Sequence, residues 1–183
     1  MAKNKAALAR EAIDQLALYD DPFDTPESEA ENALRENDFF NDELLSHTKI
    51  KSSLVGNIAE LKKSYAKVIL ETTHDMAVDD FGLIHSGFIF GSAEYAAVAS
   101  INQENVVVIA CRSKFFAPAK VGNTIEFEAK GRFEDARKRE VKVIGKINDI
   151  KVFEGVFQAV LLENHILKTK IDELQASLDA NSL

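Results

Sequence analysis

The segment His85 to Gln103, HSGFIFGSAEYAAVASINQ, differs clearly from the sequence around it. It is rich in small residues and apolar on nearly all sides, which predicts a helix that is buried all round. One strand-like segment precedes it and four follow it. This order predicts a long helix wrapped by a curled antiparallel sheet, which is an α+β arrangement.

Five segments around this helix have the composition or alternation of β-strands. The clearest is TIEFEAK, in which Ile125, Phe127 and Ala129 share one face. The predicted strands are Lys67–Thr73, Asn105–Phe116, Thr124–Lys130, Arg139–Ile147 and Val152–Leu162. Together they predict a five-stranded sheet.

Additional helices are predicted on both flanks. Ala6–Tyr19 is rich in Ala and Leu, whereas Glu27–Leu45 is acidic and is either a docked helix or a mobile arm. Helical spacing of apolar residues occurs twice more, at Ile50, Leu54, Ile58 and Leu61 and again at Leu167, Ile171, Leu174 and Leu178. We therefore divide the chain into an N-terminal extension (1–63), a central domain (64–163) and a C-terminal amphipathic helix (164–183).

Charge and composition exclude several classes of protein. Between Asp20 and Glu43 there are ten acidic residues and one basic residue, so the remainder of this chain of net charge −8 carries about +1. No basic face is available for nucleic acid. The single cysteine, Cys111, forms no intrachain disulfide and is expected to be a small buried hydrophobe. No secretory signal and no membrane span are evident, so we expect a cytoplasmic protein.

The carboxylate of Glu94 is the first candidate for chemistry. It is the one acidic residue between His85 and Glu104, in the middle of the apolar helix. Burying a carboxylate is costly unless it is paired or useful. Apolar surroundings raise its pKa and make it a better proton acceptor near neutral pH. The alternative is that Glu94 lies on an exposed strip of the helix or is simply hydrogen-bonded.

The start of the same helix is the second candidate. Its first N–H groups lack intrahelical partners and favour negative charge, so they suit a carbonyl oxygen that becomes an oxyanion. Ser86 and Gly87 are small enough to let a ligand approach the backbone. Ordinary N-capping by Ser86 is the alternative, and both roles are compatible.

The run HSGFIFGSAEYAA resembles the signature of hot-dog thioesterases of the phenylacetyl- and 4-hydroxybenzoyl-CoA type. In that family a His-Gly-Gly opening is followed, nine residues after the His, by a catalytic Asp or Glu, and His85 and Glu94 have this spacing. The segment KFFAPAKVGNTIEFEAK, Lys114 to Lys130, is similar to the family's strand, bend, glycine turn and next strand. A weaker resemblance is to the flagella-co-regulated hot-dog proteins of epsilonproteobacteria, which carry a similar N-terminal segment.

The resemblance implies an acyl-CoA thioesterase of fatty acid metabolism that works as a homodimer or a dimer of dimers. Nine residues at about 100° each give two and a half turns, from which we predict that Ser86 and Glu94 lie on opposite helix faces. The Ser86 amide of one chain then polarises the thioester carbonyl, and Glu94 of the other attacks it or activates water. We assign catalysis to Glu94, Ser86 and Gly87. Substrate contacts are predicted for His85, Asp79, Val98, Phe88, Arg132, Arg137 and Arg139, the arginines facing the phosphates of CoA.

Three departures from the family pattern support a rival hypothesis. Ser86 replaces a glycine, Val98 stands where some members carry a hydroxyl, and Asp79 stands where some carry an amide. The rival is a non-catalytic acyl-CoA sensor or adaptor, whose N-terminal extension contacts a partner protein. A dehydratase, which pairs a His with a carboxylate, ranks last because His85 is far from Glu94 of its own chain. We expect no metal and no cofactor beyond the CoA thioester, and His47 and His165 have no partners evident from the sequence.

Overall fold

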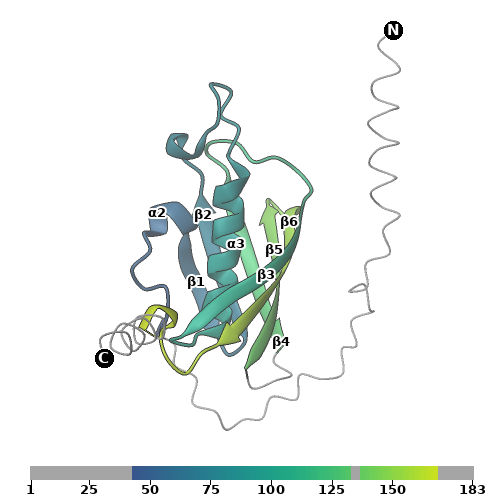
Figure 1. The fold of residues 1–183 in the computed structure, drawn as a ribbon. Coiled ribbons are helices and arrows are strands. Elements are labelled where there is room, and N and C mark those ends of the chain that lie inside the picture. Colours follow the sequence, from purple (N-terminus) through teal and green to yellow (C-terminus); the bar gives the residue numbers. More distant parts are fainter. Residues whose placement is uncertain (1–42, 133–136, 169–183) are drawn as a thin grey trace, which may run out of the picture. The chain divides into compact units, whose positions relative to one another are not determined.

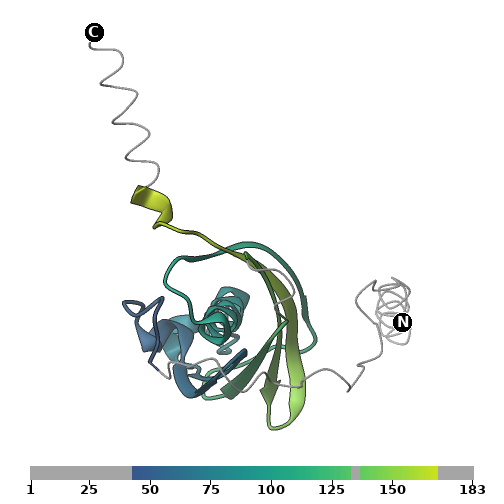
Figure 2. The same cartoon turned by 90° about the horizontal axis from the view of Figure 1, so that it is seen from below.

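The computed structural model describes residues 43–132 and 137–168. Six antiparallel strands form one sheet in the order β1-β2-β4-β5-β6-β3. The sheet curls around the helix α3 (Ser86–Ile101), which lies in its concave face (Figure 1). Figure 2 views α3 nearly end on, inside the curve of the sheet. This is the predicted hot-dog arrangement, and the fold class is confirmed.

The strands predicted from the sequence are all present. They are β2 (Tyr65–Glu71), β3 (Val106–Phe115), β4 (Thr124–Arg132), β5 (Lys138–Ile147) and β6 (Ile150–Leu161). A 3-10 turn, η1 (His74–Met76), lies in the loop that joins β2 to α3. The sheet has one strand more than the five predicted.

The additional strand, β1 (Asn57–Lys62), corrects the helical interpretation of residues 50–61. The helix α2 is short, Ser52–Val55, and β1 then pairs antiparallel with β2. A bulge between Ile58 and Glu60 adds a residue to the strand. It lets Ile58 and Leu61, three residues apart, both pack against the core. The bulge therefore gives this strand a spacing that resembles that of a helix.

Gly56 makes the sharp change from α2 to β1 possible. Its φ of 87° and ψ of 179° belong to a region that is essentially restricted to glycine. A Cβ at this position would lie 2.5 Å from the carbonyl oxygen of Ile69. The backbone here therefore requires the absence of a side chain.

We predict that Gly56→Ala lowers the free energy of unfolding by roughly 2–3 kcal/mol, because it adds both backbone strain and a steric clash. Urea denaturation measures the change. Gly91→Ala is the matched control, since a Cβ at Gly91 meets nothing within 4 Å and alanine favours a helix. Equal stability of the Gly56→Ala variant and the wild type would contradict this account.

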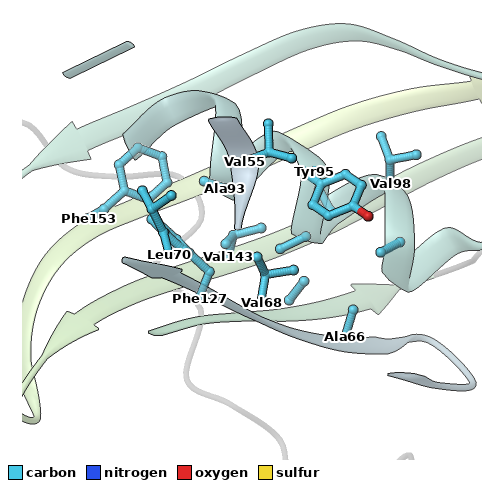
Figure 3. Close-up of a cluster of buried hydrophobic side chains, with 14 of the residues drawn as sticks. Val55, Ala66, Val68, Leu70, Ala93, Tyr95, Val98, Phe127, Val143 and Phe153 are labelled. Carbon is cyan, nitrogen blue, oxygen red and sulfur yellow. The ribbon is translucent and has the colours of Figure 1, made fainter. Parts of the chain in front are cut away.

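The core lies between α3 and the sheet (Figure 3). The helix contributes mainly small side chains, and Ala93, Ala96 and Ala97 are at most 1% exposed. The sheet contributes the larger ones. Phe127 of β4 and Phe153 of β6 meet edge to face at 6.2 Å, across Gly145 of the intervening strand β5. The small residues on the helix let the curled sheet approach it closely.

Strand β3 forms one edge of the sheet and carries exposed apolar side chains. Within the described part of the chain it pairs with β6 alone. Ile109 and Phe115 are among its exposed residues. An exposed edge strand presents unpaired backbone groups to other chains. β3 is therefore open to pairing with a further strand.

Several predictions fall outside the described residues. These are the helix Ala6–Tyr19, the acidic segment up to residue 42 and the C-terminal helix beyond residue 168. Residues 166–168 form a helical turn, and the backbone N–H of Leu167 donates to His165 Nδ1 at 3.3 Å. The described helices include none with the length and apolar character needed to cross a membrane.

Candidate functional site

Glu94 lies in the middle of α3 and is only partly shielded from solvent. Its side chain is 27% exposed, whereas the neighbouring Ala93 and Tyr95 are buried. Burial raises the pKa of the Glu94 carboxyl because desolvation disfavours the charged form, and His47 acts in the opposite direction. The raised pKa was predicted from the apolar helix. A partly buried carboxylate that is still accessible is suited to proton transfer.

A histidine that the sequence did not indicate as a site residue lies beside the Glu94 side chain. His47 Nε2 lies 3.9 Å from Glu94 Oε1. His47 has a left-handed backbone (φ 56°), and its Nδ1 lies 3.2 Å from Ser46 Oγ. Because 47 residues separate this histidine from Glu94, no local motif joins them.

Asn102 holds the segment that carries His47. It ends α3 in the left-handed conformation, with φ 48°. Its Oδ1 accepts a hydrogen bond from the Leu45 N–H at 2.9 Å, and its Nδ2 donates one to the Glu43 carbonyl at 3.0 Å. Asn102 and Ser46 are both buried. Residues 43–47 are thus attached to the C-terminal end of the helix that carries Glu94.

At the other end of α3, the structure corrects the expected cap. The N-cap residue is His85, not Ser86, and its Nδ1 accepts a hydrogen bond from the Gly87 N–H at 2.9 Å. A Cβ at position 87 would lie 2.7 Å from that nitrogen, so this cap requires glycine. The Ser86 N–H is the first amide of the helix and has no intrahelical acceptor. Of the two predicted donors, Ser86 is therefore the one that can face a ligand.

Two further predicted contacts have structural roles. Asp79 Oδ1 accepts hydrogen bonds from the backbone N–H groups of Phe81 and Leu83, both at 3.1 Å, and so shapes the loop before α3. Val98 is completely buried in the core rather than on a surface that a substrate reaches (Figure 3). Phe88 is half-buried beside His85, with their ring centroids 6.3 Å apart. Phe88 and His85 thus remain near the Ser86 amide.

The arginines predicted to hold CoA phosphates are at the opposite end of the helix. Arg137 precedes β5, its carbonyl accepts from the Leu161 N–H, and its Nη2 lies 3.2 Å from Glu163 Oε1. Arg139 Nη1 donates to the Lys138 carbonyl at 3.1 Å. Arg132 ends β4, and its side chain is outside the described part. Within one chain the end of β4 and the start of β5 lie toward the C-terminal end of α3, away from Ser86 (Figure 1).

The relation between Ser86 and Glu94 differs from the prediction. They are eight residues apart, which is a rotation of about 80°, so they are not on opposite faces. The same eight residues give an axial separation of about 12 Å. Distance along the axis, rather than rotation, prevents one helix from presenting both groups to one carbonyl carbon.

Several proteins of known structure are similar to this chain in fold and in sequence. Cj0977, a sigma28-regulated virulence protein from Campylobacter jejuni, is 47% identical, with a TM-score of 0.67 over 68% of this chain and 89% of Cj0977. PH1136, an uncharacterized protein from Pyrococcus horikoshii, is 38% identical with the same TM-score, over 68% of this chain and 96% of PH1136. A variant of the phenylacetic acid degradation protein PaaI from Thermus thermophilus is 25% identical, with a TM-score of 0.55 over 61% of this chain and 97% of PaaI.

These similarities identify the family. The chain belongs to the hot-dog thioesterase superfamily, in the same family as Cj0977. Both resemblances predicted from the sequence are thereby confirmed. No protein-family model matches the chain.

Curated relatives match in part of their length. Methylthioribose-1-phosphate isomerase of Aquifex aeolicus is 38% identical over 120 residues, which are 66% of this chain and 26% of the isomerase. Transcription factor FapR of Thermoanaerobacter is 26% identical over 127 residues, 69% of this chain and 64% of FapR. The chain thus spans about a quarter of the isomerase and less than two thirds of FapR.

Proposed function

We propose that the protein binds an acyl-CoA and hydrolyses its thioester between two copies of the chain. The observation that carries the proposal is Glu94, a partly exposed carboxylate whose pKa is raised by its apolar helix. Membership of the thioesterase superfamily supports thioester chemistry at this position. We further propose that the protein acts in the cytoplasm, in fatty acid metabolism.

In this proposal the Ser86 N–H donates to the thioester carbonyl oxygen and stabilises the negative charge that develops there. Glu94 of the second copy acts on the carbonyl carbon as a nucleophile or through water. In the water route, Glu94 accepts a proton while the new C–O bond forms. The C–S bond then breaks, and the proton passes to the CoA thiolate. The products are a carboxylic acid and free CoA.

A homodimer is supported by two features of the described chain. The axial separation of about 12 Å between Ser86 and Glu94 requires a second helix to complete the site. The edge strand β3 offers unpaired backbone groups together with the exposed Ile109 and Phe115. Pairing through this edge covers apolar surface that is otherwise in water.

Thiol release from a panel of acyl-CoA esters tests the proposal, with aliphatic and aryl acyl groups compared at equal concentration. We expect at least one ester to be cleaved with a kcat near or above about 1 s⁻¹, within the usual range for enzymes. Isothermal titration calorimetry with a non-hydrolysable CoA thioether measures binding separately. Binding without thiol release from any ester would contradict hydrolysis but not recognition.

A second candidate, an acyl-CoA sensor or adaptor, is supported by the similarity to the transcription factor FapR. In this role the chain binds the ester without cleaving it, and a protein partner that contacts the N-terminal extension reads the bound state. The same calorimetry and thiol assay separate the two functions. Retained binding in Glu94→Gln with no turnover in the wild type is the result that favours the sensor.

A further inference from the structure

His47 and Glu94 come from parts of the chain that only the fold brings together. The 3.9 Å between His47 Nε2 and Glu94 Oε1 is short enough for a direct electrostatic interaction. The two hydrogen bonds of the buried Asn102 to residues 43 and 45 fix the backbone just before His47. Two independent features, a close pair and an anchored backbone, therefore coincide at the proposed site.

We infer that His47 is a positioning residue for Glu94, and that the segment 43–47, which precedes the sheet, completes the active site. The inference rests on the proposed function, because it assigns a partner to the carboxylate that performs the chemistry. Asn102 acts indirectly, because it holds the segment 43–47 in place. Residues 43–47 are thereby coupled to the site through the C-terminal end of α3.

Among the described residues, His47 is the electrostatic partner of Glu94. No further charged residue of the described part contributes to the Glu94 pKa. On α3 itself the adjacent titratable residue is the buried Tyr95, and α2, which packs against α3, has the sequence SSLV. The buried residues of the strands that contact α3 are apolar: Ala66, Val68 and Leu70 of β2, Val106 of β3, Ile125, Phe127 and Ala129 of β4, Val141 and Val143 of β5, and Val152, Phe153, Phe157 and Ala159 of β6. Strand β1 has no buried residue, and its Glu60 is paired with Lys62.

The physical effect of His47 has a definite sign. A protonated imidazole favours the ionised carboxylate, so it lowers the Glu94 pKa that burial raises. Removing the imidazole leaves desolvation unopposed and moves the pKa of Glu94 upward. The fraction of Glu94 that is ionised, and can act as a base or nucleophile, then falls on the acidic side of its titration.

The experiment compares His47→Gln, which removes the charge, with His47→Lys, which supplies a charge that does not titrate near neutral pH. The pH dependence of kcat/KM is measured for each. We expect the acidic limb of His47→Gln to move to higher pH, with a loss of about 3- to 10-fold on that limb that disappears at high pH. His47→Lys should restore the limb toward the wild-type position.

Asn102→Gly tests the anchor separately. Glycine keeps the left-handed backbone at position 102 but removes the two hydrogen bonds to residues 43 and 45. We expect the acidic limb of the pH profile to shift in the same direction as for His47→Gln. The circular dichroism spectrum should be the same as that of the wild type. His74→Gln, a change at an exposed histidine of η1, is the matched control and should leave the profile unchanged.

A readout that does not depend on turnover separates this inference from the proposed function. Carbon-13 NMR of glutamate-labelled protein follows the Glu94 carboxyl, assigned by its loss in Glu94→Gln. The midpoint should be higher in His47→Gln than in the wild type, even if no ester is hydrolysed. An unchanged midpoint in His47→Gln would overturn the inference, and absence of turnover with a shifted midpoint would overturn only the hydrolase proposal.

Discussion

Replacing Glu94 with glutamine is expected to lower kcat for acyl-CoA hydrolysis by about 10²- to 10⁴-fold. Glutamine keeps the size and the hydrogen-bonding capacity of the side chain but accepts no proton and forms no covalent intermediate. Thiol release under saturating ester measures the effect. Calorimetry on the same variant should show that CoA-ester binding persists, because the carboxylate acts on the carbonyl carbon rather than on the CoA moiety.

The matched control is Glu104→Gln, which neutralises an exposed glutamate shortly after the C-terminal end of α3. Its rate should equal that of the wild type. Stability gives a second check with a definite sign. Since burial raises the Glu94 pKa, ionised Glu94 costs folding free energy above that pKa and not at low pH. Glu94→Gln should therefore be at least as stable as the wild type at neutral pH. Equal rates of hydrolysis for Glu94→Gln and the wild type would show that Glu94 has no part in catalysis.

The largest loss of stability is expected for Phe127→Ala, at about 3–5 kcal/mol. Phe127 is fully buried, and its ring contacts Phe153 edge to face across Gly145. Truncation removes apolar contacts and leaves a cavity between sheet and helix. The cavity cannot collapse readily, because strand β4 is hydrogen-bonded to both neighbouring strands, β2 and β5. Equilibrium urea denaturation, followed by circular dichroism, measures the change.

Phe81→Ala is the control for ring size. Phe81 is 95% exposed in the loop before α3, so its truncation should change stability by no more than about 0.5 kcal/mol. A loss for Phe127→Ala as small as that for Phe81→Ala would show that the rings beneath α3 do not form the core described above. Gly145→Ala tests the same packing in the opposite way, by overfilling it, because its Cβ would lie 2.8 Å from the Phe127 ring.

The central helix and the strands after it could be predicted because their signals are local. An all-apolar, small-residue run indicates a buried helix, and alternation indicates a strand with one face inward. Strand β1 could not be predicted in this way. Its bulge places Ile58 and Leu61, three residues apart, on one face of the strand. An apolar spacing of three residues is typical of a helix. Gly56, whose φ of 87° ends the preceding helix, is the signal that was available.

The buried helix and the position of Glu94 within it could be predicted from local sequence, since both depend on neighbours within a few turns. The rise of the Glu94 pKa follows from the burial of that helix. That Val98 faces the core and that His47 lies against Glu94 is evident from the folded chain alone. These depend on how distant segments pack. The two hydrogen bonds between Asn102 and residues more than fifty positions earlier join segments that no local spacing relates.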